Sequence, residues 1–289
     1  MVKTIDQLCH FTKELATLKE IFIHGFKPSY ASETLGKRKI KVAMVSLSNI
    51  LLRDVGEQEV LNYGSYGIIM SRDWGIANKF NPVVYTYDEG LLQQGIDEVI
   101  SNSVFLGYVE NFKDKFKEMS DCKCGPFSKQ IDLTPISDES KAIVDYLSMK
   151  YDEELIKAIS AQNRNAHEIN LRTIKLTKPY KVTNSKGEEF IAYNDREWRK
   201  IYAELPIIFE EDEEYGKWDK VKKPHFNDGP HLIRFGNKDV RAILVESNEE
   251  VTEMVKFLEE GYGKEDIKEL LGKGRLIIGP KSMLEEAGF

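Results

Sequence analysis

The sequence contains few cysteines, no long apolar run and no excess of basic residues. Its three cysteines, Cys9, Cys122 and Cys124, make a poor disulfide framework, which predicts a reducing compartment. No segment approaches the roughly 18 consecutive apolar residues that a membrane-spanning helix needs, and the opening "MVKTIDQLCHF" lacks the apolar core of a signal peptide. We therefore expect a cytoplasmic protein that does not bind a membrane.

Several signatures of known chemistry are also missing. The chain has no Walker loop, no Gly-x-Gly-x-x-Gly turn after a strand and no Gly-x-Ser-x-Gly elbow. Cys122 and Cys124 have no histidine or cysteine partners at zinc-finger spacing, so we expect no metal site. The formal net charge of −7 argues against non-specific binding to a phosphate backbone.

The hydrophobic pattern indicates an α+β fold. The β-branched run "IKVAMVSLSNI" at 40–50 predicts a buried strand, and the later half of the chain contains a predicted hairpin with its turn at 184–187. Between them, 88–162 mixes charged and apolar residues at helical spacing. We predict one α+β domain over 1–289 with a helical insertion at 88–162, whose simplest role is to cover a sheet.

Capping signals set the ends of the expected helices. The segment "HFTKELATLKEIFIHGF" predicts a helix with one apolar face over 15–22, capped by Thr12 and ended by Gly25. Ser71 is a candidate cap for a short helix, and a capping box that starts at Ser247 predicts a longer one.

Three segments could carry chemistry. The first is "HFT" at 10–12, and the second is "YGSYG" at 63–67, whose glycines allow the close approach of either a ligand or a neighbouring strand. The third is "YNDREWR", in which Glu197 lies between two arginines. The plain structural interpretation of Glu197 is an outward-facing carboxylate that pairs with a neighbouring arginine, if Trp198 faces the core.

The order of these segments, with "GFKPSY" and "YGSYGIIMSRDWGIANKFNPVVY" between them, resembles the AbiGi-type abortive phage-resistance proteins. Those are bacterial defence proteins that are encoded beside a partner protein and are often described as the antitoxin half of a toxin–antitoxin pair. The resemblance touches residues 9–87 and 190–202. It implies a role in abortive infection, an antiviral defence, and a cognate toxin as protein partner.

The same layout resembles the ADP-ribosyltransferase fold of the His-Tyr-Glu kind, which implies an ADP-ribosyltransferase-like mixed β core and NAD as substrate. In that fold His10 would bind the adenosine ribose, and Tyr66, or with less support Tyr63, would stack on the nicotinamide. Glu197 would accept from the ribose 2′-OH and stabilise the cationic transition state. The implied catalytic residues are Glu197, His10 and Tyr66, and the implied NAD-binding residues are His10, Phe11, Thr12, Tyr63, Gly64, Tyr66 and Gly67.

Three functions therefore remain open from the sequence. The chain could be a defence enzyme that transfers ADP-ribose to a nucleic acid or a protein. It could instead be a non-catalytic antitoxin that restrains a toxin by contact, a role that an acidic protein suits if the toxin is basic. The third possibility is a nucleotide-sensing module, in which the 88–162 insertion would transmit occupancy of the site.

Overall fold

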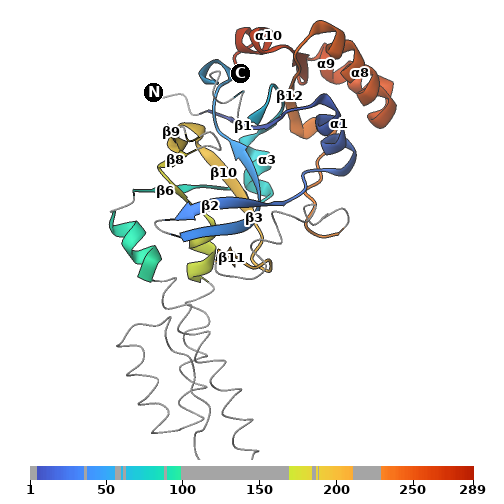
Figure 1. Ribbon diagram of the computed structural model, residues 1–289. Helices are drawn as coiled ribbons and strands as arrows, with labels where there is room; N and C mark the ends of the chain where they lie inside the picture. The colour runs from blue at the N-terminus through green and yellow to red at the C-terminus, as the bar shows by residue number, and fades with distance from the viewer. Residues whose placement is uncertain are drawn as a thin grey trace, which may run out of the picture. The chain divides into compact units, whose positions relative to one another are not determined.

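The structure is a computed structural model that describes residues 5–35, 38–55, 60, 63–87, 90–98, 169–183, 187, 189–210 and 229–289 (Figure 1). The chain divides into two compact units, Met1–Tyr85 with Leu176–Phe289 and, separately, Thr86–Lys175. Most of the predicted insertion, and both Cys122 and Cys124, lie outside the described residues. The single-domain organisation and the helical insertion at 88–162 therefore stay predictions.

The larger unit is built on a nine-stranded sheet in the order β13-β12-β4-β1-β3-β10-β5, with β2 and β11 also paired to β3. Among the strands that the structure describes in this sheet, β12 and β13 run parallel and the other pairs are antiparallel. The strands are β1 (Gln7–Thr12), β2 (Ser29–Leu35), β3 (Arg38–Ser48), β4 (Tyr66–Ser71), β5 (Asn81–Pro82), β10 (Glu197–Ile201), β11 (Ile208–Phe209), β12 (Val240–Leu244) and β13 (Ile277–Gly279). This mixed sheet with helices confirms the α+β class, while likeness to the ADP-ribosyltransferase fold stays a prediction.

Two smaller sheets accompany it. One pairs β6 (Val84–Thr86) with β7 (Thr177–Pro179), and the other pairs β8 (Lys181–Thr183) with β9 (Glu189–Ile191). The β8–β9 pair is the predicted hairpin, and Gly187 in its connection has a φ of +84°, which favours glycine.

The three helices predicted from capping signals are present in the larger unit, and one of their expected caps is wrong. α1 (Leu15–His24) ends at Gly25, whose N–H bonds to the Ile21 carbonyl, as expected. Thr12, however, is the last residue of β1, and Glu14 occupies the cap position without a side-chain bond. The expected Thr12 cap is wrong because Thr12 still pairs with Tyr66 of β4, and its hydroxyl bonds the backbone of Glu14, the residue before the helix.

The other caps are confirmed. Ser71 accepts a hydrogen bond from the Trp74 N–H at 3.1 Å and starts α3 (Arg72–Ala77). Ser247 and Glu250 form the capping box of α8 (Asn248–Tyr262). The remaining helical segments are α9 (Lys264–Gly272), α10 (Lys281–Glu286) and the short 3-10 turns η1 (Leu52–Asp54), η2 (Ala192–Asp195) and η3 (Asn237–Asp239).

The core lies on both faces of the sheet. Neighbours on β1 show this directly, because Leu8 packs with residues of α1, α8 and α9 whereas Cys9 packs with residues of η1 and α10. In Figure 1, α1, α8 and α9 accordingly lie together beside the sheet. Within the described residues, no helix has the length and apolar character needed to cross a membrane.

Candidate functional site

The cavity that holds the predicted residues His10 and Glu197 has a volume of about 240 Å³ and lies in the larger unit. Strands β1, β2, β3, β7 and β10 supply most of its walls. Its lining residues are Cys9, His10, Phe11, Ala31, Glu33, Met44, Ser46, Ser48, Tyr63, Lys178, Asp195 and Glu197. Pockets for drug-sized ligands commonly measure about 300–1,000 Å³, so this cavity suits a smaller group.

Glu197, the first residue of β10, is 7% exposed. One of its carboxylate oxygens, Oε1, accepts bonds from Ser46 Oγ at 2.7 Å and Arg199 Nε at 2.6 Å. The other, Oε2, accepts from Lys178 Nζ at 2.7 Å and from the Arg199 guanidinium at 3.2 Å. The arginine pairing expected from the sequence is therefore present, but the expected outward-facing position is wrong, since both oxygens are buried and engaged.

Arg199 is the centre of this network and is completely buried. Besides Glu197, its guanidinium donates to the Glu33 carboxylate on β2 and, at 3.2 Å, to the Thr177 carbonyl. Side chains alternate along β10, so Glu197 and Arg199, two positions apart, point to the same side of the strand and form an ion pair. The sheet is thus buried on the face that the sequence suggested was exposed.

Electrostatics hold the Glu197 carboxylate in its ionised form. Burial alone would raise its pKa, but the positive charges of Arg199 and Lys178 outweigh burial and lower the pKa to about 2. Burial raises the pKa of Glu33, an effect that Arg199 opposes. A carboxylate with so low a pKa is a poor proton donor or acceptor near neutral pH, and a substrate hydroxyl could reach it only by displacing an existing bond.

A second acidic residue, Asp195, lies beside this carboxylate. Lys178 Nζ is 2.7 Å from Glu197 and 3.8 Å from Asp195 Oδ2. The Tyr63 hydroxyl donates to Asp195 Oδ2 at 2.8 Å. Burial and the Asp195 charge raise the pKa of Tyr63, so its hydroxyl stays protonated. The tyrosine that lines this cavity is therefore Tyr63, which the resemblance supported less than Tyr66.

His10 lies on β1 and is partly buried. Its Nδ1 is 3.0 Å from the Ser46 carbonyl, and its ring packs edge-on against Phe26. Burial lowers the pKa of His10, and the bond to Ser46 only partly offsets this. In the neutral ring, Nδ1 carries the proton and donates a hydrogen bond to the Ser46 carbonyl, which leaves Nε2 as a hydrogen-bond acceptor.

Tyr66 lies elsewhere. It is the first residue of β4, is 8% exposed and belongs to the core cluster under α8. Its hydroxyl donates to Glu250 Oε1 at 2.8 Å and Glu246 Oε2 at 3.2 Å, near the start of α8. The structure therefore brings His10 and Glu197 to one cavity but does not bring Tyr66 to it.

The glycines of 63–67 allow the backbone of the neighbouring strand β1 to approach closely. A Cβ on Gly64 would lie 2.1 Å from the Thr12 carbonyl oxygen, and a Cβ on Gly67 would lie 3.3 Å from the His10 carbonyl oxygen. Of the two possibilities left open by the sequence, the close approach by a strand is thus observed, because β4 pairs with β1 here. Of the other residues implied for NAD, Phe11 lines the cavity and Thr12 is buried without lining it. The NAD-binding and catalytic roles stay predictions.

Three residues of the site were missed from the sequence. Glu33, Ser46 and Lys178 each supply a contact to Arg199 or Glu197. They lie on three different strands, β2, β3 and β7, and a polar residue in a strand normally indicates a solvent-facing position. Long-range strand pairing, which no local pattern shows, turns these positions inward.

Comparison with known proteins identifies the family. Residues 27–246, more than half of the chain, match the family described as "Putative abortive phage resistance protein AbiGi, antitoxin". The match includes the 88–162 region, to which the sequence resemblance did not extend, and it begins after His10. No curated protein and no solved structure matches the chain. The chain, whose cavity surrounds a fully paired Glu197, therefore belongs to the AbiGi family of abortive-infection antitoxins.

Proposed function

We propose that this protein is a non-catalytic antitoxin, which restrains a cognate toxin by binding it. The observation that carries the proposal is its membership of an antitoxin family, because an antitoxin implies a toxin as partner. The acidic net charge of −7 agrees with a basic partner, since complementary charge accelerates association.

The geometry around Glu197 supports binding rather than turnover. Transferase chemistry would need a carboxylate that is free to accept a ribose hydroxyl, whereas Glu197 is occupied by Arg199, Lys178 and Ser46. Cys9, another lining residue, offers no nucleophile because burial raises the pKa of its thiol to about 12. These groups act as structural support for the sheet that carries the binding surfaces.

The test is co-expression with the protein encoded by the adjacent gene. Growth should stop when that protein is expressed alone and resume when this chain is co-expressed, and the two should co-purify at a fixed ratio. Glu189→Lys, which reverses an exposed charge on β9, serves as a control that should still rescue growth. Growth rescue without a stable complex would contradict restraint by contact.

A second function is favoured by one observation, the shared cavity of His10 and Glu197. If the site binds NAD, or a smaller nucleoside fragment suited to about 240 Å³, the protein would be a nucleotide sensor or a transferase. Nicotinamide release from NAD would identify the transferase. A ligand-dependent rise in melting temperature without nicotinamide release would identify the sensor.

A further inference from the structure

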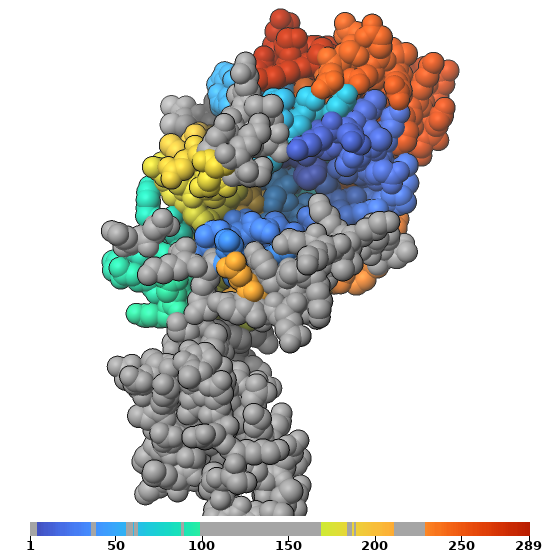
Figure 2. Space-filling view, viewed as in Figure 1, coloured from blue at the N-terminus to red at the C-terminus, as the bar shows by residue number. Residues whose placement is uncertain are grey.

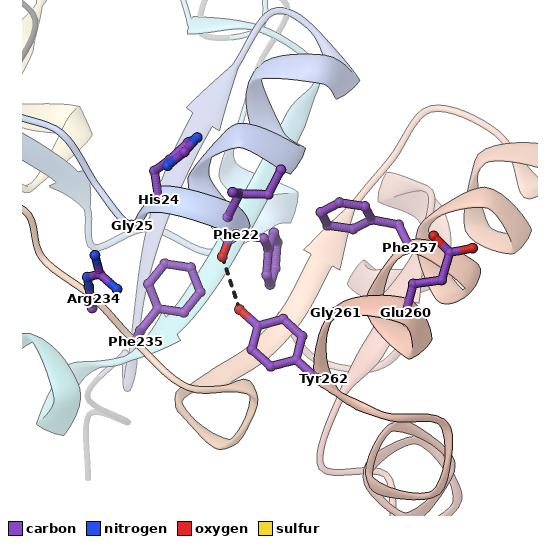
Figure 3. Close-up of a pocket in the computed structure, with 10 residues that line it drawn as sticks. Phe22, His24, Gly25, Arg234, Phe235, Phe257, Glu260, Gly261 and Tyr262 are labelled. Atoms are coloured by element: carbon purple, nitrogen blue, oxygen red, sulfur yellow. Dashed lines mark hydrogen bonds between the residues drawn. The ribbon is translucent and has the colours of Figure 1, made fainter. Parts of the chain in front are cut away.

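A separate groove of about 540 Å³ opens between α1, the segment before β12 and the end of α8 (Figure 3). None of its lining residues takes part in the Glu197 network. Four aromatic side chains dominate its walls, and the full lining is Phe22, Ile23, His24, Gly25, Arg234, Phe235, Phe257, Glu260, Gly261 and Tyr262. Its volume falls within the range of about 300–1,000 Å³ typical of sites that bury a bound group.

The aromatic walls are held in place before any partner arrives. Phe22 makes edge-to-face contacts with Phe235, Phe257 and Tyr262, with ring centroids 5.5, 6.4 and 6.4 Å apart. The Tyr262 hydroxyl donates to the Phe22 carbonyl at 3.1 Å, as Figure 3 shows. A preformed site binds at a lower entropic cost, because its side chains are already ordered.

Two charged groups flank this apolar lining. Arg234 comes from the segment before β12 and Glu260 from α8 (Figure 3). Both are exposed, and within the part of the chain that the structure describes neither has an ion-pair partner within 4.0 Å. Ile23, on α1, adds an apolar rim position and is 56% exposed. An aromatic pocket with polar groups at its edge is the usual arrangement of a protein-binding hot spot.

The helical segment that begins beside the groove is rich in acidic residues, although Glu253 pairs with Lys19 of α1 and Glu269 pairs with Lys273. Residues 246–269, which form α8 and most of α9, contain nine acidic and three basic side chains, a formal net charge of −6. These helices are the orange surface beside the blue N-terminal segments in Figure 2. Nucleic acid would be repelled by this face. A second copy related by two-fold symmetry would place the acidic face against itself, which is also unfavourable.

We propose that this groove is the anchor site for the cognate toxin, and that it takes an apolar or aromatic side chain from a basic segment of that toxin. A neighbouring lysine or arginine of the toxin would pair with Glu260, and Arg234 would donate to the backbone carbonyls of the same segment. The acidic faces of α8 and α9 would form the polar rim. This inference rests on the proposed antitoxin function and adds where and how the toxin binds.

The experiment measures the affinity of the purified product of the adjacent gene for the full chain. The test variant is Ile23→Asp with Glu260→Lys, which places a charge at the apolar rim and reverses the free carboxylate. The matched control is Ile76→Asp with Glu189→Lys. Ile76 on α3 is 55% exposed and Glu189 is an exposed acid, so the same changes are made outside the groove.

We expect the test variant to bind the toxin roughly tenfold or more weakly, while the control stays within about twofold of wild type. Both variants should melt at the wild-type temperature, because the changed positions are exposed. Wild-type binding by the test variant would overturn the groove proposal and leave the antitoxin function intact. If the wild-type chain itself does not bind the toxin, the proposed antitoxin function is wrong, and the groove proposal, which rests on it, is wrong as well.

Two further outcomes would assign the groove to another occupant and also overturn the proposal. One is a wild-type homodimer, seen by sedimentation, that dissociates in the test variant but not in the control. The other is binding of a labelled oligonucleotide that the test variant loses. Rising salt should weaken toxin binding by the wild-type chain more than by the test variant, since one interfacial charge pair is absent there.

Discussion

Replacing Glu197 with alanine should destabilise the fold, because it removes the anion shared by two buried cations. Arg199 is fully buried, and Lys178 Nζ lies 2.7 Å from the lost carboxylate. After the change, Arg199 keeps Glu33 as a carboxylate partner, whereas Lys178 keeps Asp195, which is more distant at 3.8 Å. Two positive charges would then share less negative charge in a site that excludes most solvent.

Two estimates of the cost agree. Removing one partner of a buried ion pair typically costs roughly 3–5 kcal/mol. The pKa of Glu197 falls from its usual 4.5 to about 2, which corresponds to about 3 kcal/mol of favourable interaction with the ionised form. At roughly 2–4 °C per kcal/mol for a domain of this size, the melting temperature should fall by roughly 6–20 °C.

The assay is urea unfolding followed by circular dichroism, with wild type, Glu197→Ala and the exposed control Glu189→Ala. The control should change the free energy of unfolding by less than about 0.5 kcal/mol. Glu197→Gln keeps the shape of the side chain and should lose much of the same free energy, since charge is the main contribution. A Glu197→Ala variant within about 1 kcal/mol of wild type would refute the ion-paired role.

Three further predictions test other parts of the structure. Gly64→Ala should destabilise by roughly 3 kcal/mol or more, because φ is +108° and the new Cβ would lie 2.1 Å from the Thr12 carbonyl oxygen. A wild-type melting curve would contradict this close approach of Gly64 to Thr12. Ser247→Ala should cost about 1 kcal/mol in chemical denaturation by removing the α8 cap. Because the pKa of Glu197 is depressed, its contribution should persist above about pH 4.5 and disappear as the pH falls toward about 2. Glu33, whose pKa is raised, acts in the opposite direction. The net fall in the free energy of unfolding on acidification should therefore be smaller than about 3 kcal/mol.

Local signals in the sequence predicted the elements well. The caps at Ser71 and Ser247, the end of α1 at Gly25 and the β8–β9 hairpin all depend on hydrogen bonds within a few residues. Such bonds depend on residue types that are close in the sequence, so local sequence patterns can predict them. Thr12 failed as a cap because strand pairing with β4 extends β1 through that residue.

The candidate site was less predictable because strand pairing across the chain creates it. Tyr63 and Tyr66 look equivalent in "YGSYG", yet β4 starts at Tyr66, which directs that ring into the core under α8. Tyr63 precedes the strand and reaches Asp195, 132 positions away in the sequence. Glu33 becomes a partner of Arg199 only after β2 and β10 both pair with β3.

The buried network also closes the chain around its long intervening segment. The Tyr85 hydroxyl accepts from the Glu197 N–H at 2.8 Å, Lys178 pairs with the Glu197 carboxylate, and the Val84 N–H bonds to the Leu176 carbonyl at 2.9 Å. The points where the chain leaves and re-enters the larger unit are thus fastened next to each other. A change in the length of the 86–175 segment should therefore cost the larger unit little, because loop-closure entropy grows only slowly with loop length.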